Sequence, residues 1–175
     1  NEALSQRFGI ASERIVTSTG SDDLIPMLIR GFAPPGSEIL YFEDSFAKYP
    51  IYVLGAGCEP VVLPRDKNAD YRVRLEDVKA ALTPRTRFLL LDNPANPTGA
   101  VLDADEVRAL HAVLPTDVIL ILDEAYAEFS DLGDAGLALA CEAPNVVTMR
   151  TFSKAYGLAG LRIGWCVGAP EIVEA

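Results

Sequence analysis

The chain has 175 residues, of which 50% are hydrophobic and 23% charged, enough for one α/β domain with a buried core. Its formal net charge of −10 argues against nucleic acid or an anionic membrane as partner, since both need a basic surface. No apolar run approaches the roughly 20 residues that span a bilayer, and the first residues lack the pattern of a secretion signal. Cys58, Cys141 and Cys166 are widely spaced and odd in number, so we expect free thiols in a reducing compartment, the cytoplasm.

Short apolar or β-branched runs alternate with helix-like segments along the chain. The runs predict strands at 14–17, 38–42, 60–63, 87–92, 118–123, 146–151 and 162–167. Helical spacing and turn residues predict helices at 22–32, 45–55, 75–82 and 103–114, and residues 169–175 read as the opening of another helix.

Two of these strands, at 88–91 and 118–122, are apolar throughout, which is typical of strands covered on both faces. Together with the alternation of strands and helices, this predicts a three-layer αβα sandwich with a mostly parallel seven-stranded sheet. No repeat or long linker divides residues 1–175, so we expect one domain, and its two ends suggest that it is part of a longer protein.

Polar residues follow three consecutive predicted strands, at 93–99, 123–126 and 153–154. In open α/β sheets, ligands bind outside the carboxyl ends of the strands. The sequence therefore predicts a binding site at this edge.

Lys154 differs from the other lysines because it lies in an apolar, glycine-rich segment, 151–161, with no carboxylate nearby in sequence. Such surroundings disfavour the ammonium form, and a neutral amine is what a Schiff base with an aldehyde cofactor requires. The alternative is an ordinary surface lysine on a loop.

Asp123 ends an apolar strand, so it is either a helix N-cap or the partner of a buried cation. A pyridoxal-phosphate (PLP) enzyme needs an acid beside the pyridine nitrogen. The pair Asp123 and Glu124 could instead bind Mg²⁺ beside a phosphate, but the chain has no P-loop. His111 has no partners in a metal-ligand pattern, and we expect no metal site.

The segment 19–22 joins a strand to a helix through a glycine, an arrangement that presents backbone N–H groups to an anion such as phosphate. The charge of Asp22 opposes this unless its side chain turns away, and helix capping by Ser21 or Asp22 is an equal alternative. Arg162 adds a cation suited to a phosphate group, and Thr151 and Ser153 add hydroxyls close to Lys154.

Two further residues have weaker signals. Asn96 lies in the turn sequence Asn-Pro-Thr-Gly, one strand before Asp123, so its amide could reach the same ligand. Phe46 follows the second strand and is either a core residue or a platform that stacks on a cofactor.

Taken together, the motifs at 96–99, 123–126 and 150–162 resemble, in order and spacing, those of fold-type I PLP-dependent aminotransferases of class I/II. The last of them, with Glu128 and Phe129, is most similar to the histidinol-phosphate aminotransferase branch, and the resemblance covers roughly residues 15–168.

The resemblance implies a role for each motif residue. Lys154 would hold the cofactor and move the proton of the substrate, Asp123 would pair with the pyridine nitrogen, and Tyr126 and Asn96 would bind the phenolic oxygen. Phe46 would stack on the ring, where relatives often carry Tyr. The phosphate would be held by Ser21, Asp22, Thr151, Ser153 and Arg162.

The implied reaction is amino transfer from histidinol phosphate, or a related amino donor, to 2-oxoglutarate in a homodimer. Members of this family also have a second, smaller domain and an N-terminal arm, and neither is recognisable in this sequence. The open alternatives are a PLP-dependent decarboxylase of the threonine-phosphate decarboxylase type and an inactive PLP-binding fragment.

Overall fold

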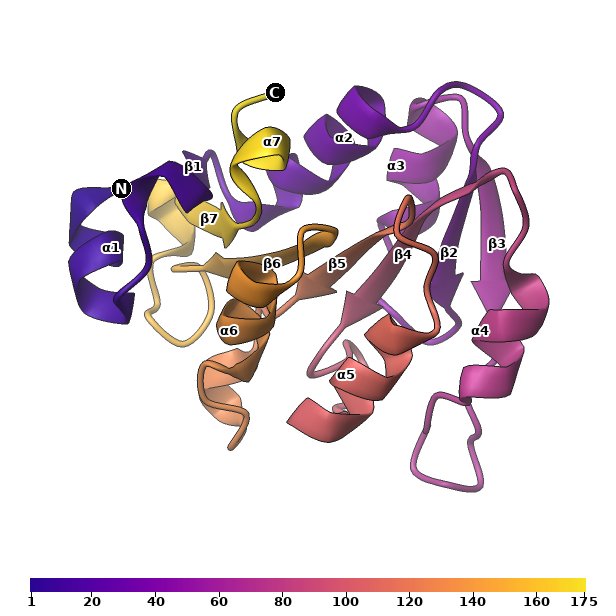
Figure 1. The fold of residues 1–175 in the computed structure, drawn as a ribbon. Coiled ribbons are helices and arrows are strands. Elements are labelled where there is room, and N and C mark those ends of the chain that lie inside the picture. Colours follow the sequence, from indigo (N-terminus) through magenta and orange to yellow (C-terminus); the bar gives the residue numbers. More distant parts are fainter.

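The computed structural model describes all residues 1–175 and contains one seven-stranded sheet covered by helices (Figure 1). The strands are β1 (Ile15–Ser18), β2 (Glu38–Phe42), β3 (Glu59–Leu63), β4 (Thr86–Asp92), β5 (Ile119–Asp123), β6 (Val146–Thr151) and β7 (Gly164–Val167). Their order across the sheet is β1-β7-β6-β5-β4-β2-β3. Only β7 runs antiparallel to its neighbours; the other adjacent pairs are parallel. The predicted mostly parallel sheet is confirmed.

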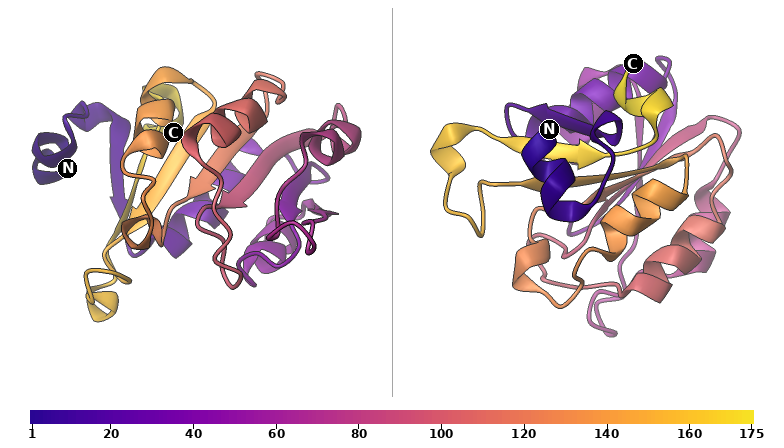
Figure 2. Two further views of the ribbon diagram at one scale, coloured as in Figure 1. Left: turned by 90° about the horizontal axis from the view of Figure 1, so that it is seen from below. Right: turned by 60° about the vertical axis from the view of Figure 1, so that its left-hand side comes forward.

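Helices cover both faces of this sheet, as the turned views show (Figure 2). One hydrophobic cluster includes side chains of α1 (Glu2–Phe8), α4 (Leu75–Ala81), α5 (Ala104–Ala112) and α6 (Ala135–Glu142). The cluster on the other face includes side chains of α2 (Ser21–Phe32) and α3 (Tyr49–Gly55), with α7 (Pro170–Val173) packed against it. Short 3₁₀ turns occur at η1 (Ser12–Arg14), η2 (Ala127–Phe129) and η3 (Ala159–Leu161).

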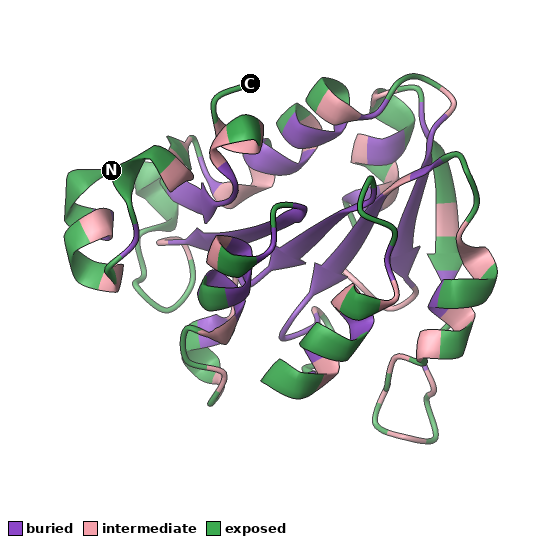
Figure 3. Cartoon of the chain, viewed as in Figure 1, coloured by how far each residue is buried: buried purple, intermediate pink, exposed green.

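The central strands are apolar throughout because successive side chains point to opposite faces, and both faces are covered. In β4, Leu89 and Leu91 belong to the first cluster, and Phe88 and Leu90 belong to the second. The buried residues accordingly follow the sheet, and exposed residues lie on the outer sides of the helices (Figure 3). This confirms the three-layer sandwich.

Several predicted boundaries need correction. The helix predicted at 45–55 begins only at Tyr49, with Pro50 in its first turn, a position that suits proline because no helical partner is needed for its missing N–H. The strand predicted at 162–167 begins at Gly164, because Arg162 adopts a left-handed backbone conformation with φ 52°. Helices α1 and α6 were not predicted: α1 is short, and α6 is apolar on nearly all sides and so lacks the expected polar stripe.

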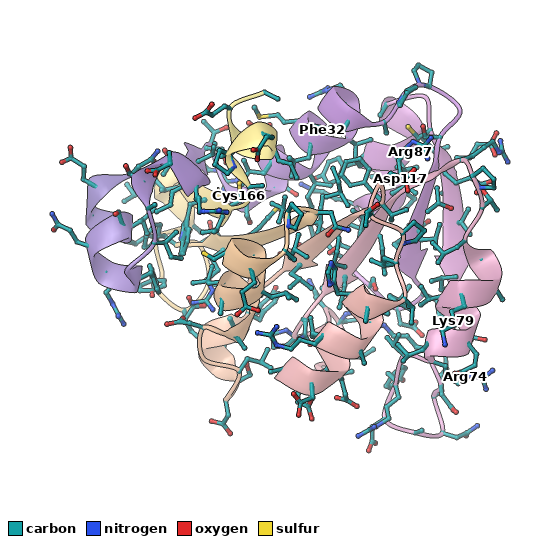
Figure 4. All side chains as sticks on the ribbon, viewed as in Figure 1. Phe32, Arg74, Lys79, Arg87, Asp117 and Cys166 are labelled. Carbon is teal, nitrogen blue, oxygen red and sulfur yellow. The ribbon has the colours of Figure 1, made fainter.

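Charged side chains lie at the surface and at the edge of the sheet opposite the predicted site. Arg74, just before α4, and Lys79, on α4, are exposed. Arg87 at the start of β4 forms an ion pair of 3.5 Å with Asp117, just before β5 (Figure 4). None of the helices is both long and apolar enough to cross a membrane.

Candidate active site

A cavity of about 280 Å³ lies at the carboxyl ends of the central strands. This volume is close to the lower end of the range of about 300–1,000 Å³ for small-molecule sites. The structure brings together in its lining all the residues that the sequence nominated: Ser21, Asp22, Phe46, Asn96, Asp123, Tyr126, Thr151, Ser153, Lys154 and Arg162. The lining also includes Gly20, Lys48, Asp92 and Ala125, which the sequence did not nominate.

Asp123 is the most unusual group in the cavity. It ends β5, is only 7% exposed, and accepts hydrogen bonds from the Tyr49 hydroxyl at 3.2 Å and the Ala125 N–H at 3.2 Å. No arginine, lysine or histidine forms an ion pair with it. Burial, and next the charge of Asp92, raise the pKa of Asp123 to about 7. A buried carboxylate without a cation favours a ligand that brings a positive charge.

The neighbouring Glu124 points elsewhere. Its carboxylate accepts a hydrogen bond from Arg150 Nε at 2.9 Å, and both side chains are buried. Its Oε1 lies only 1.9 Å from where a Cβ at position 136 would be, so this position requires glycine. Glu124 therefore does not share a ligand with Asp123, and the two carboxylates do not form the Mg²⁺ site considered from the sequence.

Lys154 follows β6, and its Nζ lies 5.2 Å from the centre of the Tyr126 ring. The prediction that an apolar turn surrounds it is wrong, because the whole segment 154–163 is exposed. Two lysines line the cavity, and they differ in their partners: Lys48 Nζ forms an ion pair of 2.6 Å with Asp22, whereas Lys154 forms none. Lys154 therefore presents an amine that no carboxylate holds.

Side chains from three further segments surround the space between Asp123 and Lys154. Asn96 Nδ2 donates to the Tyr126 hydroxyl at 3.4 Å, which places an amide and a phenol together. The Phe46 ring packs edge-on against Tyr49 at 5.7 Å and is partly exposed to the cavity. Together these groups offer an aromatic surface and two hydrogen-bonding groups to a planar ligand.

The end of the cavity at α2 is suited to an anion. The N-cap of α2 is Gly20, and no side chain caps the helix, so helix capping by Ser21 or Asp22 is excluded. The first N–H groups of a helix have no partner within it. Gly20 has φ 103°, and a Cβ there would lie 2.5 Å from Arg162 Nη2, so only glycine lets the guanidinium lie against this helix start.

The charge of Asp22 does not oppose an anion at this end. Its carboxylate accepts hydrogen bonds from Lys48 and from the Tyr52 hydroxyl. These hydrogen bonds and the positive charge of Lys48 outweigh partial burial and lower the pKa of Asp22. The carboxylate of Asp22 is thus ionised, and Lys48 compensates its charge.

Tyr49, Asp92 and Lys48 contribute to the site but were not identified from the sequence. Asp92 carried a usable signal, because it ends an apolar strand in the same way as Asp123. Tyr49 and Lys48 carried none, since their roles depend on contacts with Asp123 and Asp22 across the fold.

These features fit the cofactor expected from the sequence. The uncompensated Asp123 matches a protonated ring nitrogen, Phe46 matches a planar ring, and the glycine-cradled Arg162 with the start of α2 matches a phosphate. The amine of Lys154 opens onto the same cavity.

Comparison with known proteins defines the class to which this fold and site belong. The family model for aminotransferases of class I and II matches residues 1–175, and the chain belongs to that family.

Within that family, the histidinol-phosphate aminotransferases of Erythrobacter litoralis and Roseobacter denitrificans are 46% and 43% identical over 174 and 172 residues. Each alignment covers 98% of this chain and 47% of the relative, so the chain spans about half the length of these curated relatives.

Solved structures agree with this placement. A histidinol-phosphate aminotransferase from Sinorhizobium meliloti, in complex with pyridoxal-5'-phosphate, superposes with a TM-score of 0.89 at 33% identity and covers 99% of this chain and 47% of its own. A Thermus thermophilus aspartate aminotransferase with maleate superposes with a TM-score of 0.90 at 26% identity, covering 99% and 47%.

Proposed function

We propose that this chain binds PLP and forms the cofactor-binding part of an aminotransferase. The observation that carries the proposal is Asp123, a buried carboxylate that faces the cavity without a cationic partner and has a pKa raised to about 7. A protonated pyridine nitrogen would supply the missing charge. Bound there, PLP would act as an electron sink for the bond that breaks at the substrate.

In this proposal, different parts of the cavity bind different parts of the cofactor. The Asp123 carboxylate would hold the proton on the ring nitrogen, and Tyr49 orients that carboxylate through its hydroxyl. Asn96 and Tyr126 bind the phenolic oxygen, and Phe46 stacks on the ring. Ser21, Asp22 (through backbone N–H), Thr151, Ser153 and Arg162 hold the phosphate.

Lys154 Nζ would bind the cofactor aldehyde and move the proton at the substrate Cα. Its position supports this role. Of the two lysines that line the cavity, Lys154 is the one without an acidic partner, and its Nζ lies over the ring of Tyr126, whose hydroxyl accepts a hydrogen bond from Asn96.

For the whole protein, we propose histidinol phosphate as amino donor and 2-oxoglutarate as acceptor. The support is that the histidinol-phosphate aminotransferases named above are 46% and 43% identical to this chain, against 26% for the Thermus thermophilus aspartate aminotransferase. The three free cysteines fit a cytoplasmic location.

A homodimer is part of the same proposal. The loop after Lys154 exposes large apolar side chains, Tyr156, Leu158, Leu161 and Ile163. An exposed apolar cluster next to a cavity is typical of a protein–protein contact, and a second copy covering this loop would also shield the cavity from water.

The proposal predicts a specific covalent label. The protein is mixed with PLP, reduced with borohydride and digested, and the adduct is mapped by mass spectrometry. We expect the label on Lys154, and we expect Lys154→Ala to lose both the label and the visible absorbance of the bound cofactor.

Lys79→Met is the control, because Lys79 is exposed on α4 and does not line the cavity. It should leave the label on Lys154 in place. A label on Lys48 in the wild type, or a visible band that persists in Lys154→Ala, would contradict the assignment. With histidinol phosphate and 2-oxoglutarate, absence of glutamate would contradict this amino transfer. Release of CO₂ from threonine phosphate, which has the α-carboxyl group that histidinol phosphate lacks, would instead favour the decarboxylase.

A further inference from the structure

We propose that Asp92, held in place by Arg65, is a positioning residue that fixes two parts of the cavity wall, the segments carrying Phe46 and Asn96. The inference rests on the proposed function, because those segments matter through the ligand they surround. Neither Asp92 nor Arg65 is needed to bind the ligand directly in the roles assigned above.

The carboxylate of Asp92 is a shared anchor for two loops. Its Oδ2 accepts a hydrogen bond from the backbone N–H of Asn96 at 2.8 Å and another from the backbone N–H of Phe46 at 3.1 Å. Phe46 lies 46 residues before Asp92, in the loop after β2, whereas Asn96 lies in the loop after β4. One oxygen atom therefore ties the backbone of Phe46, which carries the ring, to the backbone of Asn96, which carries the amide.

The other carboxylate oxygen of Asp92 faces Arg65. Arg65 Nη2 donates to Asp92 Oδ1 at 3.0 Å, and the two side chains are 0% and 3% exposed. The guanidinium lies 5.2 Å from the centre of the Phe42 ring at the end of β2. It also donates to the Ser45 hydroxyl at 3.4 Å and to the Tyr71 carbonyl at 3.4 Å. Arg65 thus connects the anchor to the loop after β3 as well.

A buried ion pair of this kind does not by itself indicate a stabilising role, because the cost of desolvating both charges offsets their attraction. Here the arginine leaves its Nε without a partner, which adds to that cost. The pair instead serves the geometry of the site, since a carboxylate held by Arg65 can lie beside the cavity and accept hydrogen bonds from the N–H groups of two loops. Asp123, one strand away, lacks such a cation and remains free to take its charge partner from a ligand.

The role is tested in the full chain with Asp92→Ala and Asp92→Asn. Ala removes both loop hydrogen bonds. Asn retains an oxygen that can accept them but sets an amide N–H₂ against Arg65. We measure amide hydrogen exchange at Phe46 and Asn96 by NMR without cofactor, and the Kd for PLP by its visible absorbance.

The matched control is Glu38→Gln. Glu38 is 6% exposed and paired with Arg85 and Thr83, but it lies at the amino-terminal end of β2, away from the cavity. Glu38→Gln therefore weakens an ion pair between a buried carboxylate and an exposed arginine without touching either loop.

We expect Asp92→Ala to speed exchange at both amides by about tenfold or more and to raise the Kd for PLP by about tenfold, with Asp92→Asn between Ala and wild type. Glu38→Gln should change the two exchange rates and the Kd for PLP by less than about twofold, even if its melting temperature falls as far as that of the Asp92 variants.

Unchanged exchange at Phe46 and Asn96 in both Asp92 variants would overturn the proposal, as would a loss of PLP affinity equal to that of Glu38→Gln. If Asp92→Ala does not fold, Asp92→Asn decides by the same two readouts. Failure of the wild type to label at Lys154 would instead refute the proposed function, while the exchange data would still decide whether Asp92 holds the two loops.

Discussion

Asp92 and Asp123 are the same residue type at the ends of neighbouring strands, and their surroundings give them different properties. Arg65 compensates the charge of Asp92, whereas Asp123 has only the Tyr49 hydroxyl and the Ala125 N–H. Burial raises the pKa of both, but only that of Asp123 reaches about 7. At this site the folded chain therefore keeps a carboxylate that is poorly stabilised until a cation arrives.

This arrangement predicts a trade-off between stability and binding at Asp123. In the unfolded chain an Asp has a pKa of about 3.9, whereas in the folded chain the pKa of Asp123 is raised to about 7. The folded state thus binds more protons between these values, so the contribution of Asp123 to stability is full below about pH 4 and is lost as the pH rises to about 7.

Asp123→Asn removes this titration. Without cofactor, the variant should match the wild type near pH 4 and be more stable above pH 7, by on the order of 4 kcal/mol, while losing affinity for PLP. Urea unfolding at a series of pH values measures the difference. A variant that is less stable than the wild type at pH 8 would show that the Asp123 carboxylate is not under strain.

At the scale of elements, the site exists because β4, β5 and β6 are adjacent and parallel, so their carboxyl ends meet. This much followed from the sequence, since the uniformly apolar runs and the polar residues after them are local signals. The strands at 38–42 and 146–151 were placed with their observed bounds.

What the sequence did not predict depends on packing between distant segments. The exposure of Lys154 follows from a loop, 154–163, that no other element covers. The hydrogen bond of Tyr49 to Asp123 spans 74 residues, and that of Phe46 to Asp92 spans 46. No periodicity or local motif encodes such contacts, and only the folded arrangement brings them together.

One contact between elements predicts a sensitive position. A Cβ at Gly164 in β7 would lie 1.9 Å from the backbone nitrogen of Ser21, because the start of α2 packs directly on this strand. Gly164→Ala should therefore displace the phosphate end of the cavity. We expect it to cost about 1–3 kcal/mol of stability and to raise the Kd for PLP, measured by thermal unfolding and by absorbance titration.

Gly160→Ala is the control for this position. It lies in the nearby turn η3, and a Cβ there meets nothing within 4 Å. Its stability and its Kd should stay close to wild type. If both variants bind PLP equally well, the close approach of α2 to β7 does not shape the anion end.

At the scale of the whole molecule, one sheet supports two hydrophobic clusters that do not share residues. The clusters meet only through the backbone of the strands, where neighbouring residues such as Leu89 and Leu90 contribute to opposite faces. Because removing either layer would expose a whole face of the sheet, the two layers should not be stable separately. Unfolding should then be a single cooperative transition.

Leu89→Ala and Leu90→Ala test this cooperativity, since both leucines are fully buried in β4 and differ only in the face they occupy. Each should cost about 2–5 kcal/mol. Trp165, the single tryptophan, belongs to the cluster of Leu89. Its fluorescence should nevertheless report the same shifted midpoint for Leu90→Ala as far-UV circular dichroism does. A tryptophan transition that stays at the wild-type midpoint in Leu90→Ala would mean that the two faces unfold independently.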